Sequence, residues 1–160
     1  METITLSPTA AEIPPTTQRA IKRALTLLET HLREPGTSFT SLGTVSDWLR
    51  LRMARLEREV FMVLWLDNQH RLLAHETLFT GSINSTEVHP REIVKAALQH
   101  NAAAVLLAHC HPSGHAEPSV ADRQITGKIK DALALVEVRM LDHCIVGGMT
   151  VYSFAEHGLL

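Results

Sequence analysis

One short segment in the second half of this chain constrains its local structure more tightly than any other. Residues 102–108 form an apolar run of the length typical of a buried strand, and the run ends at His109, Cys110 and His111. Because side chains alternate across a strand, the two histidines should share one face of a sheet while Cys110 points to the other. The pattern therefore predicts two imidazoles held side by side at a strand end.

A helix is expected to begin close behind this strand, at about residue 120. Ser119 is of a type preferred at a helix N-cap, and Asp122 falls in the first turn, where the helix dipole favours a carboxylate. The apolar residues that follow recur at helical spacing: Ile125, Ile129, Leu133 and Val136. Asp122 should therefore project from a rigid helix start.

The strand end and the helix start together indicate a metal site. Histidine and carboxylate side chains are zinc ligands, and three protein ligands leave a tetrahedral ion one position for water, as in catalytic sites. Taken separately, Ser-x-x-Asp is often only a helix cap, and His-x-His can be two solvated imidazoles. Because the two patterns stand so close together, we expect His109, His111 and Asp122 to bind one Zn²⁺ per chain.

The rest of the chain is expected to form the helices and strands of an α/β layered domain. Helices are predicted within 17–40, near 46–56, after Pro90 and at 120–136, and strands at 60–66, 72–79, 102–109 and 138–146. We expect a disordered lead-in at 1–16, an N-terminal helix within 17–40 and the main domain at 41–160.

The composition limits the classes of protein to which the chain can belong. With 45% hydrophobic residues it can bury a full core, and its formal net charge of −2 predicts no general attraction to nucleic acid. No apolar run approaches the roughly 20 residues of a membrane span, and the first residues are unlike a secretory signal. We therefore expect a cytoplasmic protein with no membrane partner, in which Cys110 and Cys144 are free core thiols.

The metal-site pattern and several short sequence segments around it resemble those of a known family. His-x-His-Pro followed by Ser-x-x-Asp resembles the JAMM motif of MPN (JAB) domain metallo-isopeptidases. The neighbouring sequence segments are most similar to the RadC subfamily of bacteria and their prophages. These similar segments lie at residues 59–61, 66–72, 79–81, 88–92, 109–114 and 141–143. The resemblance covers roughly residues 40–160 and implies the MPN (JAB, cytidine-deaminase-like) layered fold, with a central mixed β-sheet flanked by helices.

The resemblance also implies an activity, zinc-dependent hydrolysis of a peptide or isopeptide bond. In the similar peptidases a glutamate before the first core strand moves the proton, and the motif serine stabilises the oxyanion. Carried over to this sequence, these roles fall on Glu59, just before the strand at 60–66, and on Ser119. From the residues alone the general base stays open among five glutamates, with Glu76 the main rival of Glu59: Glu57, Glu59, Glu76, Glu87 and Glu92.

Two features depart from the family pattern. RadC proteins usually have asparagine between the two histidines, where this chain has Cys110; since that side chain should face away from the metal, we expect coordination to be unaffected. Full-length RadC proteins resemble a helix-hairpin-helix module joined to the JAB domain, and residues 1–40 are too short for that module. We therefore expect a short, single-domain form.

Two further histidines need a separate interpretation, one in the loop between the motif residues and one in the similar segment at 141–143. His115, in a loop flanked by glycine, is expected to be exposed to solvent. His143 is expected to be a packing histidine, with a place behind the metal ligands as the alternative.

Two other classes of function stay open. A DNA-transaction accessory protein of the RadC family, without peptidase activity, would need a phosphate-binding surface, and the segment before residue 57 holds seven basic and five acidic residues. A metal-free scaffold is disfavoured because all three ligands are present. The expected partner is a protein or peptide substrate of unknown identity, with weak support for nucleic acid.

Overall fold

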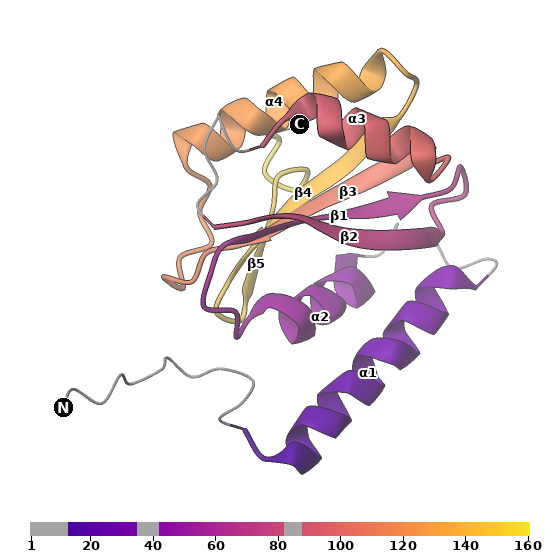
Figure 1. Cartoon of the computed structure of the whole chain (residues 1–160). Coiled ribbons are helices and arrows are strands. Elements are labelled where there is room, and N and C mark those ends of the chain that lie inside the picture. The colour runs from indigo at the N-terminus through magenta and orange to yellow at the C-terminus, as the bar shows by residue number, and fades with distance from the viewer. Residues whose placement is uncertain (1–12, 35–41, 82–87) are drawn as a thin grey trace.

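The computed structural model describes residues 13–34, 42–81 and 88–160. These residues form four helices and five strands (Figure 1). In chain order they are α1 (Pro15–Arg33), α2 (Leu42–Met53), β1 (Val60–Leu66), β2 (Leu72–Thr80), α3 (Pro90–Gln99), β3 (Ala104–Cys110), α4 (Val120–Ala134), β4 (Arg139–Gly147) and β5 (Thr150–Ser153).

The five strands form one mixed sheet in the order β2-β1-β3-β4-β5. β1 pairs antiparallel with both β2 and β3, β3 and β4 run parallel, and β5 returns antiparallel to β4. Parallel neighbours need a crossover connection, and α4 provides it between β3 and β4. The chain therefore leaves the sheet at the end of β3 and enters α4 after a connection at residues 111–119.

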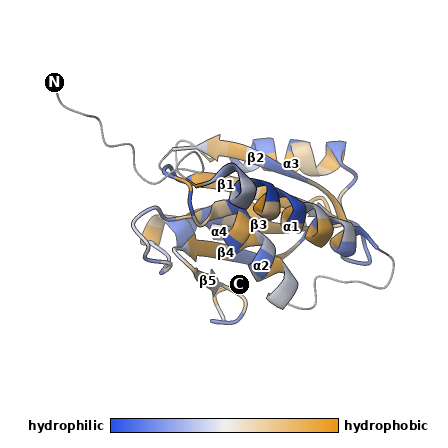
Figure 2. Ribbon diagram, turned by 90° about the horizontal axis from the view of Figure 1, so that it is seen from below, coloured by the Kyte–Doolittle hydropathy of each residue, from blue (hydrophilic) through white to orange (hydrophobic). Residues whose placement is uncertain are grey.

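Helices cover both faces of the sheet, α3 and α4 on one face and α1 and α2 on the other (Figure 1). Successive residues of β1 point to opposite faces: Phe61 and Val63 belong to the core under α3 and α4, whereas Met62 and Leu64 belong to the core under α1 and α2. Because it is covered on both sides, the centre of the sheet is almost continuously apolar, and Figure 2 shows its strands in orange among helices of mixed colour. The sheet thus separates two hydrophobic cores.

The longest helix of the described residues, α1, is attached mainly through its second half. Glu29 accepts a hydrogen bond from Nε1 of Trp48 in α2 at 3.1 Å and lies 3.1 Å from Nε2 of His75 in β2, and Leu32 is buried. In Figure 1 the C-terminal end of α1 approaches the sheet, while its N-terminal end is directed away from it. No helix in the described part of the chain has the length and apolar character needed to cross a membrane.

The predicted α/β layered architecture is confirmed, with shifts at the ends of several elements. The strand predicted at 60–66 is β1 residue for residue, but α2 begins at residue 42 and ends at residue 53, earlier than predicted. Helix α1 begins at Pro15, so the end of the lead-in predicted at 1–16 is helical, and residues 1–12 lie outside the described residues. Strand β5 is not predicted from the sequence, because its four residues are too few to show an alternating pattern.

Candidate metal centre

His109 and His111 lie on the same side of the sheet, as strand alternation predicts. His109, next to last in β3, is completely buried on the face covered by α3 and α4, where its ring stacks against Phe61. His111 directly follows the strand and is half-buried. The Nε2 atoms of the two imidazoles are 2.9 Å apart, so one ion can contact both.

The first turn of α4 brings Asp122 to the two histidines. Ser119 caps this helix: its Oγ accepts a hydrogen bond from the Asp122 amide at 3.0 Å, and Oδ2 of Asp122 accepts one from the Ser119 amide at 2.8 Å. The buried carboxylate lies 3.3 Å from Nε2 of His109 through Oδ1 and 3.3 Å from Nε2 of His111 through Oδ2. The two reciprocal hydrogen bonds of this capping box hold the Asp122 carboxylate in position.

The spacing of the three side chains fits a metal ion such as zinc. Their ligand atoms all lie within 4.8 Å of one another. A tetrahedral zinc ion about 2.0–2.1 Å from each ligand would hold those ligands roughly 3.3 Å apart. The two Nε2 atoms are 2.9 Å apart, and each lies 3.3 Å from one oxygen of the Asp122 carboxylate, Oδ1 for His109 and Oδ2 for His111. Two imidazoles and one carboxylate are also a donor set that catalytic zinc sites use. The cluster could therefore hold one ion and leave a position for an exchangeable ligand.

Each imidazole is oriented by a hydrogen bond at its other nitrogen. Nδ1 of His111 donates to the backbone carbonyl of His115 at 2.7 Å, and Nδ1 of His109 lies 2.8 Å from Nε2 of His143 in β4. A proton on Nδ1 leaves the Nε2 lone pair of each ring directed at the ion. The ring of His115 is exposed, as predicted, and only its carbonyl takes part.

His143 lies behind the ligands and connects two of them. Its buried ring places Nδ1 2.6 Å from Oγ1 of Thr126, whose hydroxyl donates to the Asp122 carbonyl at 2.6 Å. Because the Thr126 hydroxyl already donates its proton to the Asp122 carbonyl, it can only accept from His143, so Nδ1 of His143 is the donor in that contact. Nε2 of His143 then carries a lone pair and accepts a hydrogen bond from Nδ1 of His109. The prediction of a packing histidine is therefore wrong in part: the ring is buried, but it also holds a ligand in place.

The electrostatics of the cluster suit a cation. Burial by itself would raise the pKa of Asp122, but hydrogen bonds from His109 and His111 hold that pKa well below its usual range, so the carboxylate is ionised. The hydrogen bond to Asp122 raises the pKa of His111, with smaller contributions from a backbone carbonyl and the charge of Glu59, while burial opposes the increase. Burial, and after it the electrostatic effect of the neighbouring His109, lower the pKa of His143 well below its ordinary value.

Glu59 lies beside the cluster at the start of β1. Phe61 is paired with His109 across antiparallel strands, and the same register continued by two residues places Glu59 opposite His111. The contribution of its negative charge to the pKa of His111, secondary to that of Asp122, is consistent with this placement. The backbone carbonyl of Glu59 accepts a hydrogen bond from the Gly81 amide at 2.7 Å, which anchors the strand start.

The rival carboxylate, Glu76, is engaged elsewhere. It lies opposite Val63 within β2, where Oε1 accepts a hydrogen bond from Nε1 of Trp65 at 2.9 Å and pairs with Nε2 of His100. Neither of these contacts of Glu76 is with one of the three candidate ligands. Of the remaining glutamates considered, Glu57 and Glu92 are exposed, and Glu87 lies outside the described residues.

Gly147, at the end of β4, supports the site in a way that the sequence does not reveal. A β-carbon at this position would lie 2.5 Å from the Ala116 amide nitrogen and 2.7 Å from the carbonyl carbon of His115. Since backbone atoms cannot approach a side chain so closely, only glycine lets the loop after β3 pack against β4. The carbonyl that a side chain would displace is the one that orients His111.

Gly147→Ala should therefore weaken zinc binding by roughly 10–100-fold, the range typical when a partner of a metal ligand is lost. Competition with a chromophoric chelator measures the affinity. Gly127→Ala is the matched control, because a β-carbon there meets nothing within 4 Å and alanine inside α4 should stabilise the protein by about 0.5–1 kcal/mol. Equal zinc affinities for the two variants would contradict the role given to Gly147.

Cys110 faces away from the cluster, as strand alternation predicts. Its side chain is buried in the core under α1 and α2 together with Cys144 and Val146, and its Sγ donates to the Arg58 carbonyl at 3.3 Å. Both cysteines are free and buried, as predicted. Burial raises the pKa of the Cys110 thiol, so it stays protonated.

Cys110→Asn, which introduces the residue usual at this position in RadC proteins, should leave zinc affinity unchanged because the side chain does not reach the ligand face. An asparagine amide can donate to the same Arg58 carbonyl, but its other polar atoms would be buried in an apolar core, so the free energy of unfolding should fall by about 1–3 kcal/mol. Urea unfolding and zinc competition measure the two quantities, with Cys110→Ser as a second replacement. Loss of zinc from both variants would show that strand alternation does not hold at this position.

A mixed five-stranded sheet between two helical layers, with a His-His-Asp cluster where β3 leads into α4, defines an α/β domain with a candidate metal centre. The family model described as RadC-like JAB domain matches residues 39–159. The chain belongs to the RadC-like JAB domain family. The resemblance inferred from its motifs is thereby confirmed.

Similar proteins include chains of this length and longer ones. The UPF0758 protein YfjY of Escherichia coli K12 is 62% identical over 155 residues, which are 97% of each chain. YeeS of the same organism is 63% identical over 140 residues, 88% of this chain and 95% of its own. A UPF0758 protein of Dechloromonas aromatica is 63% identical over 124 residues, 77% of this chain but 55% of its own. These names state no activity.

Proposed function

We propose that the protein is a zinc-dependent hydrolase of a peptide or amide bond, with His109, His111 and Asp122 as the metal ligands. The observation that carries this proposal is the convergence of the three side chains: the two Nε2 atoms are 2.9 Å apart, and each lies 3.3 Å from a different oxygen of the Asp122 carboxylate. Both Nδ1 atoms also meet protein acceptors. When bound, the ion would supply activation of a water molecule and polarisation of the scissile carbonyl.

Glu59 is the proposed general base. It lies beside His111 on the metal side of the sheet and is absent from the group of ligand atoms. Its carboxylate takes the proton from the attacking water and passes it to the leaving amine, so one group serves both halves of the reaction. The substrate is proposed to be a protein or peptide.

Ser119 is the proposed donor to the oxyanion. Its Oγ accepts the Asp122 amide hydrogen at 3.0 Å, so the hydroxyl proton stays available for donation, and the residue is exposed at the N-terminus of α4. The positive end of that helix dipole also favours negative charge at this point. Loss of such a donor typically costs about 10²–10³-fold in turnover.

A peptide-library digest tests the proposal. The zinc-loaded protein, the same protein with 1,10-phenanthroline, and His111→Ala are each incubated with a mixed-sequence peptide library, and new termini are identified by mass spectrometry. We expect cleavage only in the first sample, at a shared sequence context. Cleavage that persists in the chelator-treated sample and in His111→Ala would contradict a metal-dependent reaction.

A further inference from the structure

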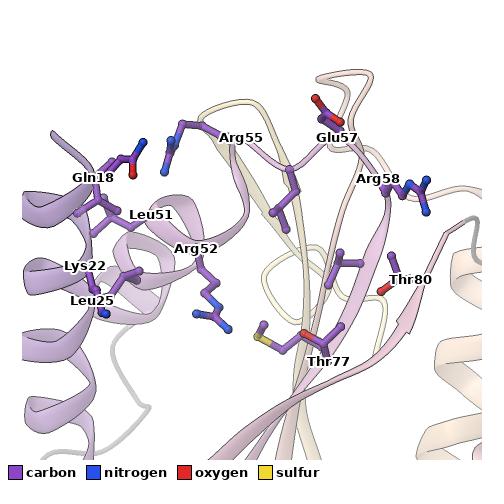
Figure 3. A pocket seen from close by; sticks show the side chains of 14 residues that line it. Gln18, Lys22, Leu25, Leu51, Arg52, Arg55, Glu57, Arg58, Thr77 and Thr80 are labelled. Carbon is purple, nitrogen blue, oxygen red and sulfur yellow. The ribbon is translucent and has the colours of Figure 1, made fainter. Parts of the chain in front are cut away.

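A second pocket lies on the face of the sheet opposite the candidate metal centre. Its volume is about 740 Å³, and it opens between the first half of α1, the end of α2 and strands β1 and β2 (Figure 3). Val60 and Met62 of β1 line it, and they belong to the core on the side away from Phe61. None of the candidate metal ligands lines this pocket, and neither Glu59 nor Ser119 does.

Four cations surround the pocket. Lys22 comes from α1, Arg52 from α2, and Arg55 and Arg58 from the segment between α2 and β1, against one acidic lining residue, Glu57. Within the described part of the chain none of the four forms a salt bridge. By contrast Arg50, also on α2, is paired with Asp47 at 3.2 Å. Among the described residues that line the pocket, cations therefore outnumber acids by four to one.

Arg55 supplies an independent observation. Among the buried side-chain nitrogen and oxygen atoms of the described residues, its Nη1 alone lacks a hydrogen-bond partner. A buried charged donor without an acceptor is unfavourable, and an anionic oxygen placed beside it would remove that cost. Figure 3 shows Arg55 extending from the end of α2 toward Gln18 of α1, while Arg52 extends between α2 and the strands.

The remaining lining is mainly aliphatic and determines which anion fits. The apolar lining residues are Ile21, Leu25, Leu51, Leu56, Val60 and Met62. The lining residues that the structure describes include no aromatic ring, so they offer no stacking surface for a nucleic-acid base. The volume is within the range of roughly 300–1,000 Å³ that is typical of small-molecule sites. An aliphatic floor below a ring of cations is complementary to a molecule with an apolar body and an anionic head.

We propose that this pocket binds a small amphiphilic anion, a phosphate or carboxylate group attached to an aliphatic chain. Arg55 binds the head group, because a guanidinium offers paired donors that match both oxyanions. Lys22, Arg52 and Arg58 add positive charge around the pocket, and the apolar residues hold the chain. The site is independent of the metal centre, because β1 lies between the two.

Calorimetric titration of the full chain with three ligands tests the head group. We expect saturable binding of octyl phosphate or octanoate with one site per chain, and binding of uncharged octyl glucoside at least about tenfold weaker. The tighter of the two anions tells whether the natural ligand is phosphorylated or carboxylated. Absence of saturation by both anions, or equal binding of octyl glucoside, would overturn the proposal.

Matched variants locate the binding site. Arg55→Gln and Arg52→Gln should each weaken binding of the preferred anion by about tenfold. Arg23→Gln, which removes the same charge from the residue next to Lys22 but does not line the pocket, should bind as the native chain does. His111→Ala should also bind normally, so a failure of this site is distinguishable from a failure of the metal centre. Equal affinities for Arg52→Gln, Arg55→Gln and Arg23→Gln would overturn the assignment.

Discussion

Glu59→Gln protein should keep its full zinc content and its stability, yet lose turnover of a cleaved peptide by about 10²–10⁴-fold. Glutamine has nearly the shape of glutamate but cannot accept the proton of the attacking water. Since Glu59 is not among the clustered ligand atoms, the ion should stay bound. The measurement is kcat on a peptide from the library digest, with zinc determined on the same preparation.

Glu76→Gln is the matched control for this prediction. The Glu76 carboxylate, in β2, accepts a hydrogen bond from Trp65 of β1 and pairs with His100 at the end of α3. Its replacement should therefore affect stability and leave turnover close to that of the native protein. An inactive Glu76→Gln beside an active Glu59→Gln would show that the general base is placed on the wrong strand.

Asp122→Asn should lose zinc more severely than any change behind the ligands, by more than the roughly 10–100-fold that follows loss of a ligand's partner. The side-chain amide oxygen of asparagine can still accept the hydrogen bond from the Ser119 amide, so the cap is retained and α4 should remain folded. The negative charge that draws the two imidazoles and the ion together is what the substitution removes. Zinc competition and circular dichroism measure the two effects separately.

Asp131→Asn removes the same charge from an exposed position on the same helix. Its zinc affinity should equal that of the native protein, which separates the local effect at the site from a change in net charge. An Asp122→Asn variant that bound zinc as tightly as Asp131→Asn would exclude Asp122 as a ligand.

The candidate ligands could be predicted from the sequence because their arrangement depends on local rules. Strand alternation places His109 and His111 together, and a capping box fixes Asp122 within the first turn of α4. Both rules act over a few residues, and the short connection between β3 and α4 keeps the two segments close in the chain. The core cysteines follow from the same alternation.

The supporting residues could not be predicted, because they depend on contacts between distant segments. His143 meets His109 only because β3 and β4 pair in parallel in one register, and Thr126 joins them only because α4 packs on that face. The pair Gly147-Gly148 is explained in the sequence by a turn, so nothing there indicates that the Ala116 backbone approaches Gly147 closely. The engagement of Glu76 by its neighbours likewise becomes visible only in the folded chain.

X-ray absorption spectroscopy combined with elemental analysis of the native protein tests most directly whether His109, His111 and Asp122 hold a zinc ion. We expect one zinc per chain, bound only by nitrogen and oxygen at about 2.0–2.2 Å, and loss of that zinc in His109→Ala and His111→Ala. A metal-free native protein, zinc retained in both variants, or a zinc–sulfur distance near about 2.3 Å that disappears in Cys110→Ser would contradict the site.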